Sequence, residues 1–206
     1  ESNAEGSIIG GGYQNTVYNG KLSGIFRGSG NYIDGLGGGQ GSYFIGSGYG
    51  NTIIDDSFIG VSSILNGNGN VLNTHYSTII GGNQNKILIN SFYSSIIGGD
   101  RNEISNNYSF IGGGVQNKAS GQMSTVINGG QSEAKGDASI VLNGTNIADS
   151  HCEIVGGIWG TTYTPISRTS FNIADRIFNI GIGTSDILRK DGISVFKNGV
   201  ATLPTV

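Results

Sequence analysis

The stretch STIIGGNQNKILINSFYSSIIGGDRN, residues 77–102, contains one structural unit twice. Each copy has a pair of bulky apolar residues, Ile79-Ile80 or Ile96-Ile97, followed directly by Gly. An Asn lies four residues after that Gly, and an apolar residue follows two places later. A short recurring unit cannot bury its apolar residues alone and must stack on its neighbours. The sequence therefore predicts a solenoid of stacked turns.

The apolar pair followed by Gly or Asn recurs over most of the chain, with Ile25-Phe26 before Arg27 as a degenerate further copy. Successive copies are about 13 to 20 residues apart, which predicts about ten short coils whose extra length lies in the loops between them. The pairs are Ile8-Ile9, Phe44-Ile45, Phe58-Ile59, Ile64-Leu65, Ile79-Ile80, Ile96-Ile97, Phe110-Ile111, Val126-Ile127, Val141-Leu142 and Ile154-Val155.

Each unit is expected to form two short strands, the first from the apolar pair and the second from the Asn-led segment, for example residues 85–87. Side chains alternate between the two faces of a strand, so Ile79 and Ile80 must point in opposite directions. We therefore expect the first strand to be buried on both faces. The second strand carries an apolar residue beside a charged one, such as Glu103 or Lys118, and is expected to face solvent on one side.

The outward members of the pairs form a continuous apolar column, which would favour aggregation if it were left open on a monomer. Because the column repeats along the axis, its simplest cover is the same column from identical copies around a parallel rotation axis. The pattern predicts a homotrimer, intertwined or side by side; the alternative is a monomer with a covering helix or loop, but no sufficiently long amphipathic segment is present. The residues assigned to the core or the trimer seam are Ile8, Ile9, Phe44, Ile45, Phe58, Ile59, Ile79, Ile80, Ile96, Ile97, Phe110, Ile111, Val126, Ile127, Val141, Leu142, Ile154 and Val155.

Glycine is expected at the corners, because 38 of 206 residues are Gly, more than twice the usual share of about 7%. Runs such as residues 10–12 and 112–114 directly follow the first strand, where tight turns need positive φ. The Asn residues that follow are expected to adopt left-handed conformations, and Asn from successive turns is expected to pair as an internal ladder.

The composition limits the classes of partner. The net charge is −3 and no basic stripe is present, which argues against nucleic-acid binding. No run of 18 apolar residues exists, so membrane insertion is not expected. The single Cys152 excludes an intrachain disulfide. The N-terminus lacks a targeting segment and the C-terminus lacks a capping feature, so we expect a piece of a longer chain.

The repeat pattern ends near residue 160. We expect residues 1–160 to form the β-solenoid and residues 161–206 to form a small C-terminal β module. In this module, residues 176–180 and 193–197 are predicted strands, and Asn198-Gly199 is a turn signal.

Two resemblances follow from these motifs. The units at residues 7–10, 95–99 and 124–129 resemble the repeats of trimeric autotransporter adhesin heads of the YadA type, which implies a left-handed parallel β-roll that trimerises through one face. Residues 175–186 and 195–199 resemble modules found late in phage tail fibres and related bacterial surface fibres, often just before a trimerising chaperone domain. The chain departs from the adhesin heads in favouring Ile and Phe over Ala and Val and in having longer loops.

The acidic residues and the pair His151-Cys152 are expected to have structural roles and not catalytic or metal-binding ones. Two carboxylates on adjacent coils can reach the roughly 5 to 9 Å of glycosidases, but solenoid surface carboxylates usually serve solvation, and we expect no enzyme activity and no cofactor. The acidic residues considered are Asp34, Asp55, Asp56, Asp100, Glu103, Asp137, Asp149 and Glu153, with Asp55-Asp56 and Asp100-Arg101 as the first suspects. The soft ligands His151 and Cys152 point apart on a strand, so no metal site is expected in one chain.

Aromatic residues suggest a binding strip. Tyr76, Tyr93 and Tyr108 each precede a Ser of the repeat, and Tyr18 precedes Ser23 in an intercoil loop. Exposed aromatic rings stack on sugars; the structural alternative is that they pack over the turns or against a neighbouring protomer. The proposed glycan-binding residues are Tyr18, His75, Tyr76, Phe92, Tyr93 and Tyr108.

The sequence favours a trimeric fibre segment for attachment, the receptor-binding part of a phage or phage-like tail. Three chains would present identical loops to a cell-surface glycan or protein, and weak contacts would sum to avidity. The protein is then expected in a virion tail or at a cell surface. A bacterial adhesin of the trimeric autotransporter type is the second hypothesis and an ice-binding solenoid the third, although irregular outward charges, such as Lys86 and Glu103, oppose an ice-lattice match.

Overall fold

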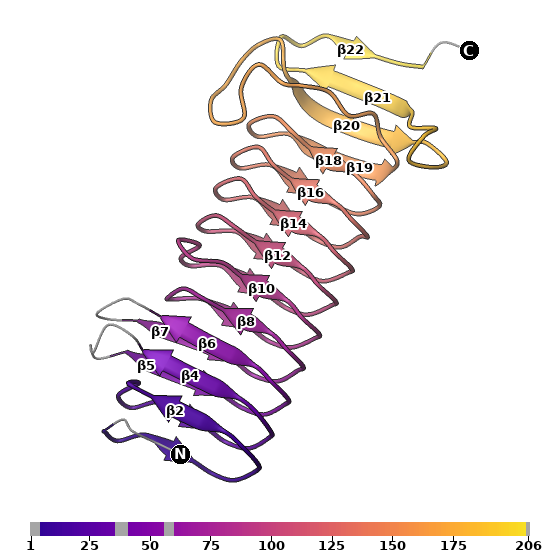
Figure 1. The fold of residues 1–206 in the computed structure, drawn as a ribbon. Helices are drawn as coiled ribbons and strands as arrows, with labels where there is room; N and C mark the ends of the chain where they lie inside the picture. Colours follow the sequence, from indigo (N-terminus) through magenta and orange to yellow (C-terminus); the bar gives the residue numbers. More distant parts are fainter. Residues whose placement is uncertain (1–4, 36–40, 56–59, 205–206) are drawn as a thin grey trace. The chain divides into compact units, whose positions relative to one another are not determined.

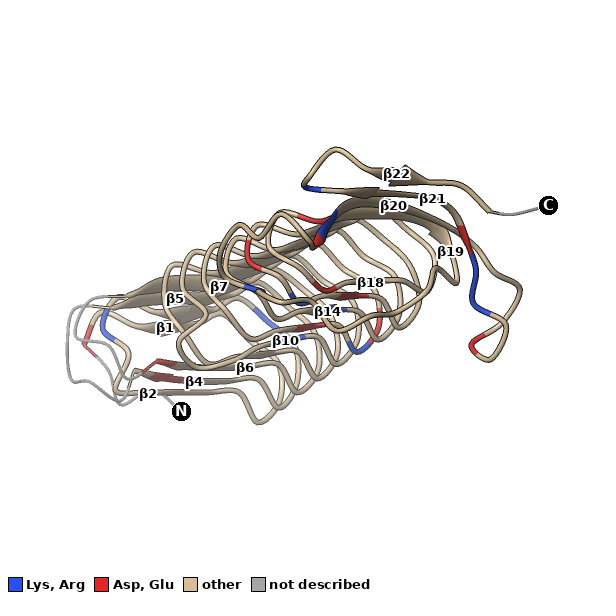
Figure 2. Ribbon diagram, turned by 90° about the horizontal axis from the view of Figure 1, so that it is seen from above, with Lys and Arg blue, Asp and Glu red and all other residues tan. Residues whose placement is uncertain are grey.

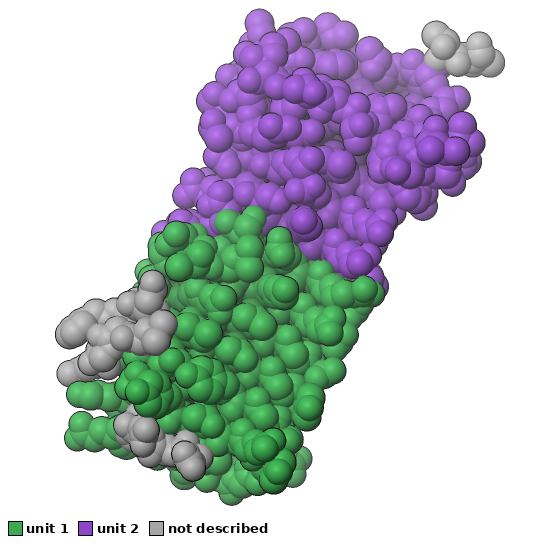
Figure 3. Space-filling model, viewed as in Figure 1, with its two compact units in different colours: residues 1–105 green, residues 106–206 purple. Residues whose placement is uncertain are grey.

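The computed structural model describes residues 5–35, 41–55 and 60–204, and no α-helix occurs among them. The described chain is a parallel β-solenoid, which confirms the predicted all-β fold (Figure 1). It divides into two compact units, residues 1–105 (unit 1) and residues 106–206 (unit 2), shown in Figure 3. A domain boundary after residue 160 stays a prediction.

Unit 1 contains six described turns, each made of one strand in a first sheet and one strand in a second sheet. Within each sheet, neighbouring strands are parallel. The first sheet comprises β1 (Ile8–Ile9), β3 (Gly24–Ile25), β5 (Ser42–Ile45), β7 (Val61–Ile64), β9 (Thr78–Ile79) and β11 (Ser95–Ile96). The second sheet comprises β2 (Thr16–Tyr18), β4 (Tyr32–Gly35), β6 (Thr52–Asp55), β8 (Val71–Leu72), β10 (Lys86–Ile87) and β12 (Glu103–Ile104).

Unit 2 contains three described turns and then lengthens its first sheet. Strand β20 pairs in parallel with β19, and β21 and β22 add antiparallel strands, so residues expected at 176–180 and 193–197 are indeed strands. The first sheet comprises β13 (Phe110–Ile111), β15 (Thr125–Val126), β17 (Ile140–Val141), β19 (Ile154–Ile158), β20 (Arg176–Ile182), β21 (Asp191–Phe196) and β22 (Ala201–Thr202). The second sheet comprises β14 (Lys118–Ala119), β16 (Glu133–Ala134) and β18 (Ile147–Ala148).

The core contains one apolar side chain from each strand of a turn. In the first sheet the fully buried column is Ile25, Ile45, Ile64, Ile79 and Ile96 in unit 1 and Ile111, Val126, Val141 and Val155 in unit 2. The opposite orientation of adjacent apolar residues is therefore confirmed. The buried member is the first residue of some pairs and the second of others, because register with the neighbouring strand, and not order within the pair, decides it.

The structure differs from the predicted repeat at the turn of Ile25 and Phe26. Ile25-Phe26 is a regular turn and not a degenerate copy, because β3 pairs with both β1 and β5 and Ile25 is fully buried. The pair Phe58-Ile59 lies outside the described residues, and the separately predicted pair Ile64-Leu65 begins at the end of β7, with Ile64 in the core. About nine complete turns result, close to the ten that were predicted.

An asparagine ladder runs inside unit 1 and confirms the predicted pairing. The Asn85 side chain donates through Nδ2 to Asn70 Oδ1 (3.2 Å), and its Oδ1 accepts from the backbone N and from Nδ2 of Asn102 (3.0 and 3.1 Å). The members of this ladder, all buried, are Asn15, Asn31, Asn51, Asn70, Asn85 and Asn102. In unit 2, Ser132 stands between Asn117 and Asn146 and continues the chain of hydrogen bonds.

The expected left-handed conformation of these asparagines is wrong. Glycine does supply positive φ at the corners, as in Gly48 (φ 116°), but the second left-handed position is the residue before the ladder Asn, such as Gln84 (φ 53°) or Arg101 (φ 55°). The ladder Asn itself must point its amide inward along the stack, so the residue ahead of it makes the bend.

Candidate interaction surface

The outer face of the first sheet carries exposed bulky side chains. Phe26 is 66% exposed and Phe44 is 45% exposed, each beside a fully buried Ile. In each first-sheet strand, the residue before the core residue and the residue after it both point outward. In almost every turn one of these two outward residues is bulky and the other is small. Written in that order, the pairs are Ile8/Gly10, Gly24/Phe26, Phe44/Gly46, Ser63/Leu65, Thr78/Ile80 and Ser95/Ile97 in unit 1, and Phe110/Gly112, Thr125/Ile127, Ile140/Leu142 and Ile154/Gly156 in unit 2. Only Ile140/Leu142, among these described pairs, has two bulky members.

The same face is free of charge. None of the described first-sheet strands from β1 to β19 contains Asp, Glu, Lys or Arg, and their ribbons are tan in Figure 2. The second sheet differs, because Lys86 pairs in register with Glu103, and Lys118 with Glu133. The prediction that the second strands face solvent is confirmed. The apolar column predicted on the first strands is exposed in the single chain.

Four aromatic side chains in unit 1, His75, Tyr76, Phe92 and Tyr93, form what we call the aromatic ridge. The rings of Tyr76 and Tyr93 stack with their centroids 5.0 Å apart and 3° between their planes, and those of His75 and Phe92 stack at 4.1 Å. Tyr76 is 38% and Tyr93 is 52% exposed. The facing sides of the two tyrosine rings cover each other, so the ridge presents ring edges and hydroxyl groups outward.

The two other predicted strip residues lie elsewhere. Tyr108 belongs to unit 2 and holds the same place before a repeat Ser, with a left-handed backbone (φ 58°). Tyr18 is not in an intercoil loop, as was expected, but ends strand β2 of the second sheet, and Leu22 (φ 53°) occupies the corner position in that turn. The loop prediction failed because β2 is one residue longer than most second strands.

The acidic residues considered act in ion pairs and hydrogen bonds, and Asp34, Asp55 and Asp149 are buried instead of lying on the surface as was expected. Asp100 lies 2.7 Å from Arg101 Nε, and the hydrogen bonds donated by Asn83 and by Arg101 lower the pKa of Asp100. Asp55 Oδ1 lies 3.7 Å from His75 Nδ1, while its suspected partner Asp56 lies outside the described residues. Asp34 accepts a hydrogen bond from the Tyr32 hydroxyl (2.9 Å). The remaining acids considered are Glu103 in β12, Asp137, which accepts from Gln122 N, and Asp149, which pairs with Arg168.

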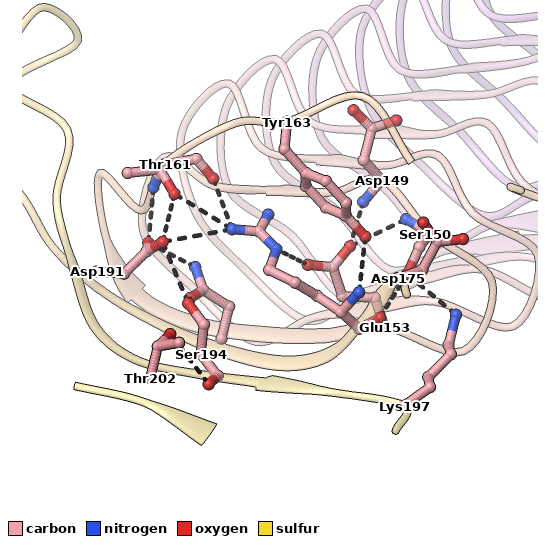
Figure 4. Close-up of polar contacts among 12 residues, drawn as sticks. Asp149, Ser150, Glu153, Thr161, Tyr163, Asp175, Asp191, Ser194, Lys197 and Thr202 are labelled. Atoms are coloured by element: carbon pink, nitrogen blue, oxygen red, sulfur yellow. Dashed lines mark hydrogen bonds and ion pairs between the residues drawn. The ribbon is translucent and has the colours of Figure 1, made fainter. Parts of the chain in front are cut away.

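A buried ion pair in unit 2 was not predicted. Arg176 Nε lies 2.9 Å from Glu153 Oε1, both side chains are buried, and Arg176 Nη1 also lies 3.4 Å from Asp191 Oδ2 (Figure 4). The Tyr163 ring packs 4.1 Å from the guanidinium carbon, and Arg176 Nη1 donates to the Thr161 carbonyl (3.0 Å). These charged side chains turn toward each other and hold residues 161–163 in place.

Burial governs the ionisation of Glu153. Loss of solvent raises the pKa of Glu153, and the Arg176 charge and hydrogen bonds from the backbone N atoms of Ser150 and Asp149 only partly oppose this. The expectation that His151 and Cys152 point apart on a strand is wrong, because both residues lie in a turn and His151 Nε2 lies 3.3 Å from Cys152 Sγ. Within the described ranges, no group of three or more His, Cys, Asp or Glu is placed to hold a metal ion.

The outer face of unit 1 also contains a hollow that sequence reasoning missed. It has a volume of about 420 Å³ and extends over β1, β3, β5 and β7, with Ile8, Phe26, Phe44 and Val61 among its lining residues and the buried Gly24 in β3. The available signal was the glycine of β3, which stands where other turns carry Ser, Thr or a bulky residue.

Comparisons with known proteins returned no match, either among family models or among curated proteins. In the part of the chain that the structure describes, no helix has the length and apolar character needed to cross a membrane.

Proposed function

We propose that the chain is a trimeric fibre segment for attachment, the receptor-binding portion of a tail fibre of a phage or phage-like particle. The observation that carries the proposal is the outer face of the first sheet, which is charge-free and bears Phe26, Phe44, Leu65, Ile80 and Ile97 in the open. An exposed face of this kind marks a site of association. A cyclic assembly about an axis parallel to the stack covers it in every copy.

The fold suits such a role. Hydrogen-bonded ladders of buried Asn side chains tie each turn to the next, so the scaffold resists bending and holds its loops at fixed spacing. Three copies would present each loop three times, and binding to a repetitive cell surface would then gain strength by avidity. The resemblance of residues 175–186 and 195–199 to tail-fibre modules supports the same function.

The aromatic ridge is the receptor contact that we propose. Because Tyr76 and Tyr93 cover each other's facing sides, a glycan would meet ring edges and hydroxyl groups and would be held by hydrogen bonds more than by stacking. A bacterial adhesin with the same architecture is the second candidate, and the charge-free face favours it equally. The flanking segments of the full-length protein, an anchor or a tail-attachment region, distinguish the two.

The first experiment is light scattering across a dilution series. A constant mass of three chains supports the proposal, and a constant mass of one chain overturns it. The variants Ile80→Ser and Ile97→Ser, each altering an exposed seam residue, are expected to lower the mass at high dilution. The matched control is Lys86→Ser, on the outer face of the second sheet, which is expected to leave the mass unchanged.

A further inference from the structure

A second hollow in unit 1 lies away from the first sheet, where the turns of β8, β10 and β12 pass into the second sheet. Its volume is about 480 Å³, within the usual range of about 300–1,000 Å³ for ligand pockets. Its lining residues, which we call the polar hollow, are Gly69, Gln84, Lys86, Arg101, Asn102 and Glu103. Gly69 apart, each of them has a polar side chain, so an apolar ligand would leave polar groups without partners.

The polar hollow arises from two short segments in consecutive turns. Residues 84–86 (Gln-Asn-Lys) lead into β10, and residues 101–103 (Arg-Asn-Glu) lead into β12. The middle Asn of each segment belongs to the buried ladder and is committed to it. The first and third residues of each segment are therefore left to line the surface, and Lys86 pairs in register with Glu103.

Unit 2 contains the same pattern at residues 116–118 (Gln-Asn-Lys) and 131–133 (Gln-Ser-Glu), which line a smaller hollow of about 280 Å³. There, however, Gln131 Nε2 donates a hydrogen bond to Gln116 Oε1 (3.2 Å), so the two side-chain amides already bind each other. The recurrence shows that the pattern belongs to the repeat. The polar hollow of unit 1 is the better candidate for a ligand.

A chain of hydrogen bonds fixes Arg101 at the edge of the polar hollow. Asn68 Nδ2 donates to Asn83 Oδ1 (3.1 Å), and Asn83 Nδ2 donates to Asp100 Oδ1 (2.6 Å). Arg101 Nε in turn donates to Asp100 Oδ2 (2.7 Å). Among the described residues the two terminal Nη groups of Arg101 have no partner. A side chain that is held before binding loses less conformational freedom when a ligand arrives.

The charges around the polar hollow cancel. Asp100 offsets Arg101, and Glu103 lies beside Lys86 on the neighbouring strand. Lys86 is exposed and forms no ion pair with any residue that the structure describes, so its ammonium group can donate to a ligand. A ligand of either sign would meet a like charge as well as an opposite one. The lining therefore favours a neutral ligand that both donates and accepts hydrogen bonds, as hydroxyl groups do.

We infer that the polar hollow binds a neutral saccharide unit and is a second glycan contact in addition to the aromatic ridge. The inference deepens the proposed attachment function and rests on it for the class of ligand. Adjacent sugar hydroxyls would accept hydrogen bonds from the Arg101 Nη groups and Lys86 Nζ and would donate to the Glu103 carboxylate, which can accept several at once. Water competes for each of these bonds at an open site, so we expect a millimolar dissociation constant. The polar hollow then adds to binding by the ridge and does not replace it.

The test is a ligand-observed NMR titration by saturation transfer. It is made in the Tyr76→Ala/Tyr93→Ala background, in which the ridge contributes no signal, and is repeated in the unmodified protein. The neutral probes are lactose, maltotriose and triacetylchitotriose, and 3′-sialyllactose is the acidic counterpart of lactose. We expect at least one neutral probe to bind, with an affinity that changes by less than about twofold when the salt concentration is raised about tenfold, because no net charge is screened.

Two variants remove hydrogen-bonding groups from the polar hollow without adding bulk. Arg101→Gln and Glu103→Gln are each expected to weaken binding of the neutral probe by about tenfold. The matched control is Arg27→Gln, because Arg27 is also exposed in unit 1 but lies outside the polar hollow. This control is expected to leave the affinity within about twofold.

The outcomes separate this inference from the fibre proposal. If no neutral probe binds, or if Arg101→Gln and Glu103→Gln leave binding unchanged, the polar hollow is overturned as a saccharide site. Binding of 3′-sialyllactose alone, or binding that is lost at high salt, overturns the neutral ligand and indicates a charged one. A monomeric mass at every dilution overturns the fibre proposal, whereas the titration depends only on residues within unit 1 and decides the polar hollow separately.

Discussion

Replacing Asn85 by Ala interrupts the asparagine ladder in unit 1 between Asn70 and Asn102. The Asn85 amide donates to Asn70 Oδ1, to Gly81 O (3.1 Å) and to Gly99 O (3.0 Å), and its oxygen accepts two hydrogen bonds from Asn102. Asn85 and Asn102 are both fully buried.

The expected loss of stability is about 3–5 kcal/mol. A net hydrogen bond is worth about 1 kcal/mol, and a buried group left without a partner costs about 1–3 kcal/mol. The variant loses the Nδ2 group of Asn85, whose two hydrogens are shared among three acceptors, and the Oδ1 atom, which accepts two hydrogen bonds from Asn102. The buried backbone N–H of Asn102 thereby loses its acceptor. Asn85→Ser should lose about half as much, because Ser132 at the equivalent position of unit 2 still accepts from the next turn and donates to Gly144 O.

The assay is equilibrium unfolding in urea, followed by circular dichroism at one fixed protein concentration so that association does not change between variants. The matched control is Asn68→Ala, because Asn68 is exposed and makes a single side-chain bond to Asn83 (3.1 Å). We expect the control to change stability by less than about 0.5 kcal/mol. The reasoning is refuted if Asn85→Ala comes within about 1 kcal/mol of Asn68→Ala.

Three further predictions concern other parts of the chain. The pKa of Glu153 is raised in the folded protein, so the folded protein binds a proton at this group more readily than the unfolded chain does. The contribution of Glu153 to stability is therefore fully present below its unfolded pKa of about 4.3 and is lost as the pH rises through its folded pKa. Urea midpoints of the unmodified protein, relative to Glu153→Gln, should therefore rise as pH falls from neutral toward that value; a flat difference contradicts the assigned burial cost. Removing the ring stack with Tyr76→Ala/Tyr93→Ala should abolish binding on a glycan array, and Tyr76→Phe/Tyr93→Phe should weaken it severalfold by removing the hydroxyls; unchanged binding by both refutes the ridge as receptor site. Gly48→Ala should destabilise by about 2 kcal/mol or more, because φ is 116° and a Cβ would meet the Gly67 carbonyl; Gly50→Ala, where nothing lies near, should cost about 1 kcal/mol in the same urea assay.

The turn-by-turn plan of the fold was predictable from the sequence because inward positions repeat. Each turn meets an almost identical turn on either side, so the same Ile and Asn recur at the same places. Alternation along a strand then predicts that one of Ile79 and Ile80 points outward, as the structure confirms. Which one does so depends on register with the neighbouring strand, and no local pattern in the pair encodes it.

Features that depend on several separate segments were not predictable. The ion pair of Glu153 and Arg176 joins residues on either side of the change from repeat to hairpin, and neither has a motif around it. The hollow on the outer face of unit 1 requires four strands, since residues of β1, β3, β5 and β7 line it. Tyr18 was placed in a loop because the length of β2 differs from that of its neighbours by a single residue.

The outward positions of the first sheet show a variation that stacking within one chain does not demand. Ser or Thr in place of each bulky outward residue would satisfy the strands and keep the face soluble. Instead a bulky residue appears in almost every turn, before the buried residue in some turns and after it in others. Moving the bulky residue from one side of the buried residue to the other leaves the core unchanged and alters only the contour of the outer face. It therefore affects only a molecule that packs against this face. A face whose contour differs from turn to turn fits a copy of itself best at one register, so in the assembly that we propose it would favour parallel, in-register packing.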